Sequence, residues 1–351
     1  MYHKPSICSM SLGRSFAGHS LLDKLEVAAR YGFHGIELFY EDLHDFAALT
    51  TSSQPSPDDL VTAATAIRNK CTSLNLSVVC LQPFMHYEGL VSRSAHQQRL
   101  EELKVWFRLV HALGTDLMVI PSSFLSADKV TADMDLIVAD LRKAADMALQ
   151  QTPVVRIAYE AICWATRVTS WEDSWEAVQR VDRPNFGLCL DTFNMAGKMY
   201  ADPCTATRCT PDADAVVARS LKRLVATVDV SRVFLLQIAD GERLPQVLDS
   251  AHPFHLPEQP PRMSWSRNAR LFYGEDQYNA YLPTKAILKA IVKGLGFQGW
   301  LSFEVFNRVL AETDHGVPEE MARRASASWA KMVKDVGLVV DGQDSRVQAM
   351  L

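Results

Sequence analysis

Short apolar runs alternate with segments of helical periodicity along almost the whole chain. The runs are rich in Val, Ile, Leu and Phe and have the length of buried strands. Between them, apolar residues recur three and four positions apart, which is typical of amphipathic helices. Strands are therefore predicted at 7–12, 35–40, 76–82, 116–121, 154–160, 186–191, 233–237 and 299–304.

Local signals mark the boundaries of the intervening helices. Ser20 is a candidate N-cap for a helix that stops at Gly32, and Pro57 stands in the first turn of a helix that reaches Leu74. The break at Pro153 ends another helical segment. The further helices are predicted at 97–113, 132–149, 170–181 and 212–228, and beyond Pro283 and Pro318.

Eight strand and helix units in one chain predict a single (β/α)₈ barrel over residues 1–338, of the α/β class, rather than a doubly wound sheet. Residues 339–351 are predicted to form a flexible or interfacial tail. Two connections, 192–211 after strand six and 239–282 after strand seven, exceed ordinary loop lengths. We interpret them as lids or substrate walls, with a plain surface insertion as the alternative.

Composition narrows the class of partner. Of the 351 residues 48% are hydrophobic and 22% are charged, as in soluble globular proteins. The net charge of -5 offers no basic field for nucleic acid, so a small molecule is the expected partner, and assembly into a homo-oligomer is compatible with the sequence. We find no apolar stretch of about 20 residues and no signal-peptide pattern, and we expect a cytoplasmic enzyme without a membrane partner.

The cysteines do not indicate a metal framework. There are seven, an odd number without finger or ribbon spacing, and most stand in apolar runs. We expect buried free thiols. Cys204 and Cys209 lie in a polar loop without a matching pair, so a zinc or disulfide role for them is weakly supported.

A polar residue closes each of the last four strands. These residues are Glu160, Asp191, Gln237 and Glu304. The carboxyl ends of parallel barrel strands meet at one rim, which is where such barrels carry their chemistry. A single carboxylate at a strand end is often an ordinary barrel feature or a helix cap. Four polar residues on consecutive strands are harder to explain in that way, and three carboxylates cannot crowd together without a cation.

The all-oxygen set suits Mg²⁺, Mn²⁺ or a similar hard divalent ion better than a structural zinc site. A substrate carbonyl and a neighbouring hydroxyl could chelate such an ion. The enolate formed by removing the proton between them would then be stabilised. Isomerisation, epimerisation and β-elimination all begin in this way.

Motifs along nearly the whole chain are similar to those of a known family. They include S-M-S-L-G-R, Y-G-F-H-G-I-E-L-F-Y-E-D-L, L-Q-P-F-M-H-Y-E-G, L-D-T-F-N, Q-I-A-D-G-E, S-W-S-R-N-A-R-L-F-Y-G-E and F-E-V-F-N-R. The sequence thereby resembles the sugar phosphate isomerase/epimerase-like (xylose isomerase-like) barrels, and among them the fungal 3-dehydroshikimate dehydratases of quinate catabolism. The resemblance implies that the four strand-end residues bind one divalent ion, Mg²⁺, Mn²⁺ or Co²⁺. It also implies a hydro-lyase that converts 3-dehydroshikimate to protocatechuate and water through a metal-stabilised enediolate.

The substrate of that family is an anion, so the rim is expected to carry cations. Arg270 is the best-matched residue for the substrate carboxylate, with Ser264, Ser266 or Arg267 beside it, and Arg14 is a weaker candidate. Without the resemblance, an arginine in a polar loop would be interpreted as solvated.

Proton transfer is expected from the loop after strand three. His86 and Glu88 are candidate general bases, acids or hydrogen-bond partners, although an ordinary surface histidine is an equal alternative. Many relatives carry a histidine three residues after the strand-six aspartate, where this sequence has Asn194. An asparagine cannot act as a base, so Asn194 is expected to hydrogen-bond the substrate hydroxyls. Glu37 is expected to contact the substrate or play a structural role, and Trp164 to form a wall of the site or pack in the core.

Three other functions remain open at this point. A sugar or hydroxypyruvate isomerase or epimerase would use the same metal site on an open-chain or phosphorylated ketose. An endonuclease-like barrel would need a histidine-rich zinc rim and a basic face, which the sequence lacks. A non-catalytic binding barrel would be indicated by a missing metal carboxylate, and none is missing.

Overall fold

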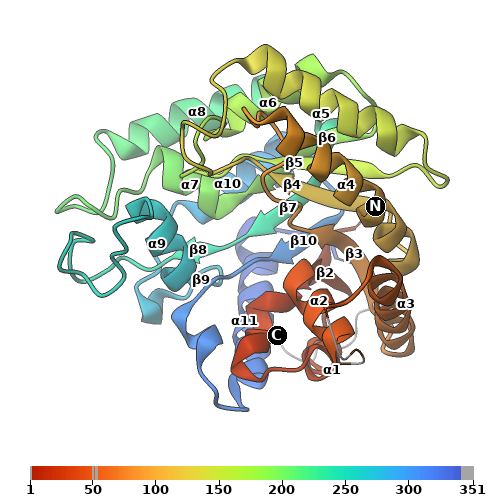
Figure 1. Ribbon diagram of the computed structural model, residues 1–351. Helices are drawn as coiled ribbons and strands as arrows, with labels where there is room; N and C mark the ends of the chain where they lie inside the picture. The colour runs from red at the N-terminus through yellow and green to blue at the C-terminus, as the bar shows by residue number, and fades with distance from the viewer. Residues whose placement is uncertain (1, 50, 52–53, 341–351) are drawn as a thin grey trace.

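A closed barrel of eight parallel strands forms the centre of the computed structural model, which describes residues 2–49, 51 and 54–340 (Figure 1). Around the barrel the strands follow the order β1-β10-β7-β6-β5-β4-β3-β2, which confirms the predicted (β/α)₈ fold. The strands are β1 Lys4–Cys8, β2 Gly35–Phe39, β3 Ser77–Gln82, β4 Leu117–Pro121, β5 Arg156–Glu160, β6 Phe186–Asp191, β7 Val233–Ile238 and β10 Trp300–Phe303.

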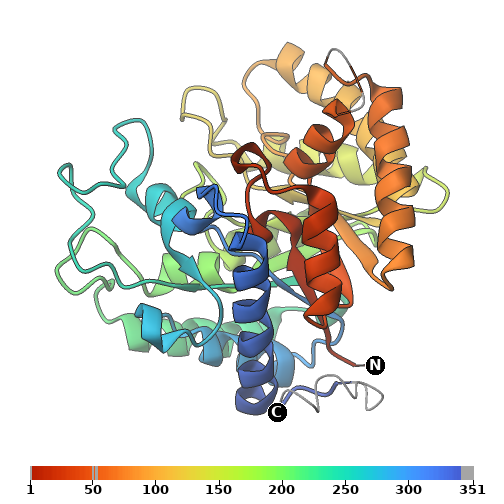
Figure 2. The same cartoon turned by 90° about the horizontal axis from the view of Figure 1, so that it is seen from below.

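Helices surround the barrel, and their ends carry the expected caps. The Ser20 side chain accepts a hydrogen bond from the Asp23 backbone, and Ser56 forms a capping box with Asp59. Figure 2 shows α1 and α11, from opposite ends of the chain, side by side. The helices are α1 Leu21–Arg30, α2 Tyr40–Ala48, α3 Pro57–Ser73, α4 Arg93–Leu113, α5 Met134–Leu149, α6 Trp171–Val181, α7 Thr192–Met199, α8 Ala213–Thr227, α9 Pro261–Ala269, α10 Thr284–Lys289 and α11 Val317–Val336.

Two N-terminal predictions were wrong in detail. The strand expected at 7–12 begins earlier as β1, and Ser9–Leu12 forms a 3-10 helix. This turn is held by its serines, because Ser9 donates to Asp42 and Ser11 accepts from the Val305 backbone. The structure also shows the helix α2 directly after β2, where the sequence pattern predicted no helix.

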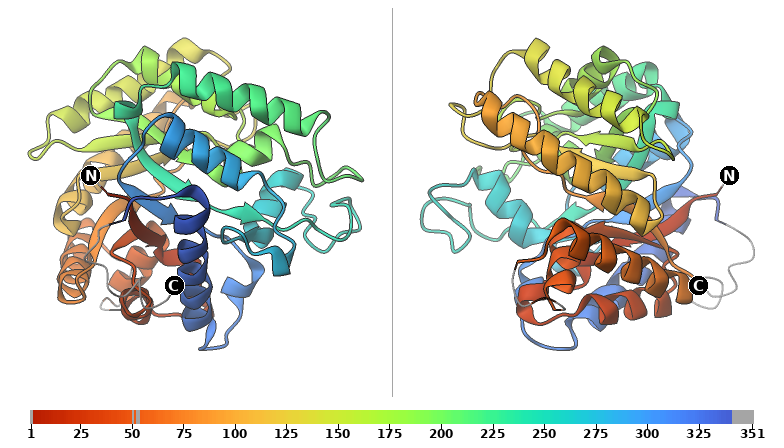
Figure 3. Two further views of the ribbon diagram at one scale, coloured as in Figure 1. Left: turned by 180° about the vertical axis from the view of Figure 1, so that it is seen from behind. Right: turned by 45° about the vertical axis from the view of Figure 1, so that its right-hand side comes forward.

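The two long connections contain more structure than expected. The first begins at once with α7, so only its second half is irregular. The second contains a short antiparallel pair, β8 Asp240–Gly241 with β9 Arg270–Leu271, and α9 lies between these two strands. Figure 3 shows this second connection, in cyan, projecting from the barrel. The predicted tail falls mostly on residues 341–351, which lie outside the described part of the chain.

The barrel interior divides into an apolar layer and a polar layer. Cys80, Val119, Ala158, Cys189 and Leu235 form one buried apolar cluster on five strands. Because side chains on a strand alternate between its two faces, the residue two positions further along also points inward. On β3, β5, β6 and β7 that residue is polar: Gln82, Glu160, Asp191 or Gln237. The strand pattern thus places a layer of polar side chains inside the barrel, at the carboxyl ends of the strands.

Other global features agree with the sequence. Five of the seven cysteines are buried, and none of the seven forms a disulfide within the described residues. In that same part of the chain, every helix is too short or too polar to cross a lipid bilayer.

A buried ion pair fixes the segment between β1 and α1. Lys24 is fully buried, and its Nζ donates to Asp42 Oδ1 at 2.5 Å and to the Gly13 carbonyl at 2.9 Å. Asp42 also accepts from Ser9 at 2.6 Å. The network ties the first loop of the rim to α1 and α2 and so holds the position of Arg14, which follows Gly13.

We expect Lys24→Met to destabilise the fold by about 3–5 kcal/mol, since it leaves the Asp42 carboxylate buried without its cation. Urea unfolding followed by circular dichroism would measure the loss. The double variant Lys24→Met/Asp42→Leu should recover much of it, because both buried charges are then removed. A loss below about 1 kcal/mol in the single variant would show that the pair contributes no more than a surface salt bridge.

Candidate active site

Three carboxylates converge at the carboxyl ends of the strands. Oxygens of Glu160, Asp191 and Glu304 all lie within 4.8 Å of one another, and each residue is at most 5% exposed. Burial raises the pKa of Glu304 to about 7, and burial together with Glu304 and Asp191 raises the pKa of Glu160 well above its ordinary value. Buried like charges at this spacing require a cation, and the oxygen donors fit a hard divalent ion.

Gln237 lies in the same layer, and its side chain is hydrogen-bonded to two other buried residues, Cys189 and Glu37. It pairs with Asp191 in the strand register, its Oε1 accepts from the Cys189 thiol at 3.0 Å, and its Nε2 donates to Glu37. Burial, followed by the charge of Glu304, raises the pKa of Glu37 to about 8. Glu37, which the sequence suggested for substrate contact, is fully buried and does not line the cavity described below.

Three hydrogen-bond donors hold the carboxylates in place. Asn194 Nδ2 donates to Glu160 Oε1 at 2.9 Å and to Asp191 Oδ2 at 2.6 Å, and Gln82 Nε2 donates to Glu304 Oε1 at 2.8 Å. Arg270 Nη1 lies 2.9 Å from both Asp191 Oδ2 and Glu304 Oε2. Asn194 therefore contacts the carboxylates themselves, and the side-chain amide expected to face substrate hydroxyls is already engaged.

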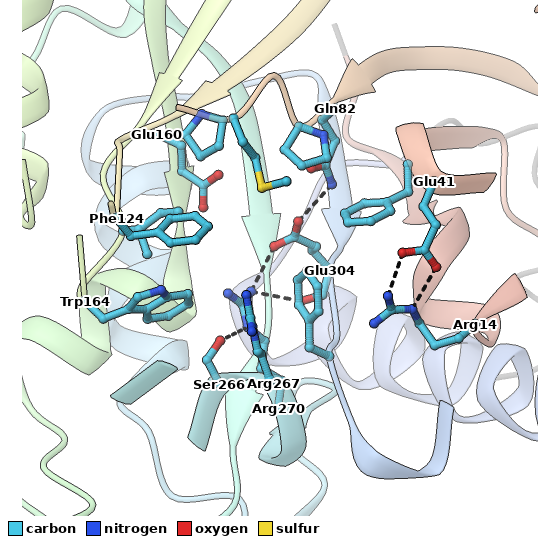
Figure 4. Close-up of a pocket in the computed structure, with 16 residues that line it drawn as sticks. Arg14, Glu41, Gln82, Phe124, Glu160, Trp164, Ser266, Arg267, Arg270 and Glu304 are labelled. Atoms are coloured by element: carbon cyan, nitrogen blue, oxygen red, sulfur yellow. Dashed lines mark hydrogen bonds and ion pairs between the residues drawn. The ribbon is translucent and has the colours of Figure 1, made fainter. Parts of the chain in front are cut away.

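A cavity of about 390 Å³ opens directly above Glu160 and Glu304 (Figure 4). Trp164 and Phe124 form one side, and the paired Arg14 and Glu41 stand on the other. Its remaining lining is Phe39, Gln82, Pro83, Met85, Pro121, Ile162, Ser266, Arg267, Arg270 and Phe306. The Nε1 of Trp164 is buried and has no hydrogen-bond partner among the described residues, so it offers a donor to a bound molecule.

The residues expected to transfer protons lie behind this cavity. The His86 ring packs edge-on against Phe124 at 4.4 Å, its Nδ1 is 3.3 Å from Ser123 Oγ, and it lines a separate cavity beside α4. Burial, with the nearby Arg99, lowers the pKa of His86 to about 4. A histidine with that pKa is neutral at physiological pH and is a weak base.

Glu88 is also turned away from the cavity. Its Oε1 accepts from the Ser123 backbone at 2.7 Å and from the Tyr159 hydroxyl at 3.2 Å, in the layer between the barrel wall and the helices. Burial raises its pKa to about 7. Ser264 is buried, does not line the cavity, and its hydroxyl has no hydrogen-bond partner among the described residues.

The sequence interpretation missed two contributors. Gln82 ends β3 as the four predicted residues end their strands, and the same signal could have identified it. The Arg270 guanidinium packs against the rings of Phe193 and Phe306, whose centroids lie 4.5 and 4.9 Å from its Cζ. No local signal in the sequence predicts that second arrangement, because the rings come from segments far apart.

The fold and the strand-end carboxylates define the class of protein: the chain belongs to the xylose isomerase-like TIM barrel family, whose model matches residues 25–332. Among particular relatives, the 3-dehydroshikimate dehydratase of Neurospora crassa is 53% identical over 347 residues, which cover 97% of each chain. The 3-dehydroshikimate dehydratase of Pseudomonas aeruginosa is 30% identical over 86% of this chain, but the match spans 38% of that longer protein. A solved xylose isomerase-like TIM barrel/4-hydroxyphenylpyruvate dioxygenase fusion protein superposes with a TM-score of 0.71 at 26% identity, over 96% of this chain and 43% of the fusion.

Glu88 generates a prediction about stability and pH. Because its pKa is raised in the folded protein, the folded state holds more protons than the unfolded state between pH 4.5 and about 7. Stability should therefore fall as the pH rises through that window, by on the order of 3 kcal/mol for this group. Glu88→Gln keeps an acceptor for Ser123 and removes the ionisation, so its melting temperature relative to wild type should be higher at pH 8 than at pH 5.

Thermal melts at both pH values would measure this difference. The exposed Glu258 provides a matched control, and Glu258→Gln should follow the wild type at both. If the melting temperatures of Glu88→Gln and wild type differ by the same amount at pH 5 and pH 8, Glu88 does not titrate between these two pH values.

Proposed function

We propose that this protein is a 3-dehydroshikimate dehydratase, a hydro-lyase that converts 3-dehydroshikimate to protocatechuate and water. The observation that carries the proposal is the 53% identity to the Neurospora crassa enzyme over 97% of both chains. The site supports it independently, since its buried carboxylates lie at the floor of a cavity with aromatic walls. The reaction removes one carbon-bound proton and one hydroxyl group from the ring, and the ring becomes aromatic.

The carboxylates of Glu160, Asp191 and Glu304, with the amide oxygen of Gln237, would hold one divalent ion, Mg²⁺, Mn²⁺ or Co²⁺. Such an ion, when bound, withdraws electron density from a substrate carbonyl and stabilises negative charge that develops on its oxygen. Asn194 and Gln82 keep the carboxylate oxygens in place before the ligand arrives. This preorganisation avoids the cost of reorienting charged groups during the reaction.

The cavity favours a cyclic carboxylate over an open-chain sugar. Trp164, Phe124 and Phe306 supply flat apolar surfaces of the kind that a six-membered ring contacts well. Arginines 14 and 267 line the same cavity and favour an anion. A sugar isomerase or epimerase would use the same carboxylates, but these walls offer few partners for the many hydroxyls of an open-chain ketose.

Direct assay tests the proposal. Purified protein with Mn²⁺ and 3-dehydroshikimate should produce the ultraviolet absorbance of protocatechuate, and removal of the metal by a chelator should abolish it reversibly. Glu160→Gln should bind Mn²⁺ more weakly and lose about 100-fold or more in kcat/KM, because metal stabilisation contributes several kcal/mol to such reactions. Full turnover by enzyme shown by elemental analysis to be metal-free would exclude the metal role, and absence of protocatechuate would exclude the activity.

His86→Gln tests the role of the loop after β3. Loss of a general acid or base typically lowers kcat by about 10²- to 10⁴-fold. Because the His86 ring lies behind Phe124, we expect a smaller loss, about tenfold or less, from altered packing of that cavity wall. Stopped-flow or steady-state assays at saturating substrate and metal would measure it. A loss above 100-fold with unchanged metal content would instead establish His86 in proton transfer.

A further inference from the structure

Two arginines that lie three residues apart in α9 and β9 have opposite environments. Arg270 is 2% exposed, whereas Arg267 is exposed at the mouth of the cavity. Figure 4 shows both among the residues that line the cavity, with Arg270 directed at Glu304. The difference in burial distinguishes Arg267 from Arg270, which the sequence analysis assigned to the substrate carboxylate.

Two of the three nitrogens of the Arg270 guanidinium, Nη1 and Nε, donate to groups of the protein. Nη1 donates to Asp191 Oδ2, Glu304 Oε2 and the Glu304 carbonyl at 2.9, 2.9 and 3.2 Å, and Nε donates to Ser266 Oγ at 3.0 Å. The rings of Phe193 and Phe306 also pack against the guanidinium. A side chain held in this way cannot turn to a substrate without breaking two buried ion pairs.

The negative charge of the three carboxylates explains why a buried arginine stands beside them. Glu160, Asp191 and Glu304 together carry three negative charges when ionised. A divalent ion would neutralise two of them, and the guanidinium of Arg270 neutralises the third. Arg270 thus permits three carboxylates to share a dry site, and its planar donor group fixes the orientation of Asp191 and Glu304.

Arg267 has the features of an anion ligand. It lines the cavity, and it forms no ion pair with any residue in the described part of the chain. Partial burial and the neighbouring charge of Arg14 lower its pKa below the usual arginine value. Arg14 is itself held by Glu41 through two hydrogen bonds, of 3.2 and 2.7 Å. Arg267 is thus a cation close to a second cation, Arg14, and has no carboxylate partner of its own. An anion bound beside the two arginines would stabilise Arg267.

We propose that Arg267 binds the substrate carboxylate, while Arg270 is a positioning residue that orients the metal-binding carboxylates. The substrate half of this proposal rests on the proposed dehydratase function. The part that concerns Arg270 does not rest on that function, because it predicts how a change at Arg270 alters the affinity for the metal, and that affinity can be measured without a substrate.

The test compares Arg270→Lys with Arg267→Met in the full chain. Lysine keeps the positive charge but lacks the planar fork, so Arg270→Lys should weaken Mn²⁺ binding by about 10- to 100-fold, as expected for a group that orients metal ligands. At saturating Mn²⁺ it should lower kcat and change KM for 3-dehydroshikimate little. Arg267→Met should raise KM by about 10- to 100-fold, the loss expected for one charge-assisted contact, with Mn²⁺ affinity within about twofold of wild type.

Isothermal titration calorimetry with Mn²⁺ and steady-state kinetics give the two readouts. Phe193→Leu supplies a milder variant if Arg270→Lys does not fold, since it removes one ring that packs against Arg270 and does not line the cavity. It should weaken Mn²⁺ binding with KM unchanged. Arg270→Lys with normal Mn²⁺ affinity and a raised KM would overturn the proposal, as would Arg267→Met with an unchanged KM.

The two levels of the proposal fail differently. If wild-type protein makes no protocatechuate, the dehydratase function and the role of Arg267 in it are excluded. The Mn²⁺ titrations of Arg270→Lys and Phe193→Leu would still decide the positioning role, because they require no turnover. If protocatechuate is made and the metal affinities of these variants match the wild type, the role of Arg270 alone is excluded.

Discussion

Mutual repulsion among three buried carboxylates is the constraint on which the rim of this barrel depends. Two unit charges 4 Å apart repel each other by about 4 kcal/mol at an effective dielectric constant of 20. The protein meets this repulsion with donors from three separate places: Gln82 on β3, Asn194 on α7 and Arg270 on β9. The long second connection is therefore part of the site, since it returns to the barrel at Arg270 and brings a cation into the carboxylate layer.

The strand-end residues could be predicted because they obey a local rule. An inward-facing apolar residue followed two positions later by a polar one is visible in the sequences of β3, β5, β6 and β7, and the parallel barrel brings these ends together. Gln82 obeys the same rule at the end of β3, so the sequence pattern could also have predicted it. Helix caps at Ser20 and Ser56 were equally local.

The surroundings of each polar group could not be predicted, because they depend on contacts between distant segments. Asn194 was expected beside the substrate, yet its position on the first turn of α7 directs it to Glu160, 34 residues earlier. His86 and Glu88 follow β3 closely, but a left-handed backbone at His86 turns the loop so that neither lines the main cavity. Arg267 and Arg270 stand three residues apart in one motif, and the packing of Phe193 and Phe306 against Arg270 alone could not be read from that motif.

The connection between β7 and α10 carries both arginines on one continuous piece, with Arg267 in α9 and Arg270 opening β9. Loops on the catalytic face of such barrels are commonly regarded as exchangeable parts that change specificity while the scaffold keeps the chemistry. Here that separation fails. A chimaera that imports this loop from a barrel with another substrate would also remove the cation from the carboxylate layer, unless the donor loop places an arginine at the same point. Under the roles proposed for Arg267 and Arg270, substrate specificity and metal binding would both depend on this one segment.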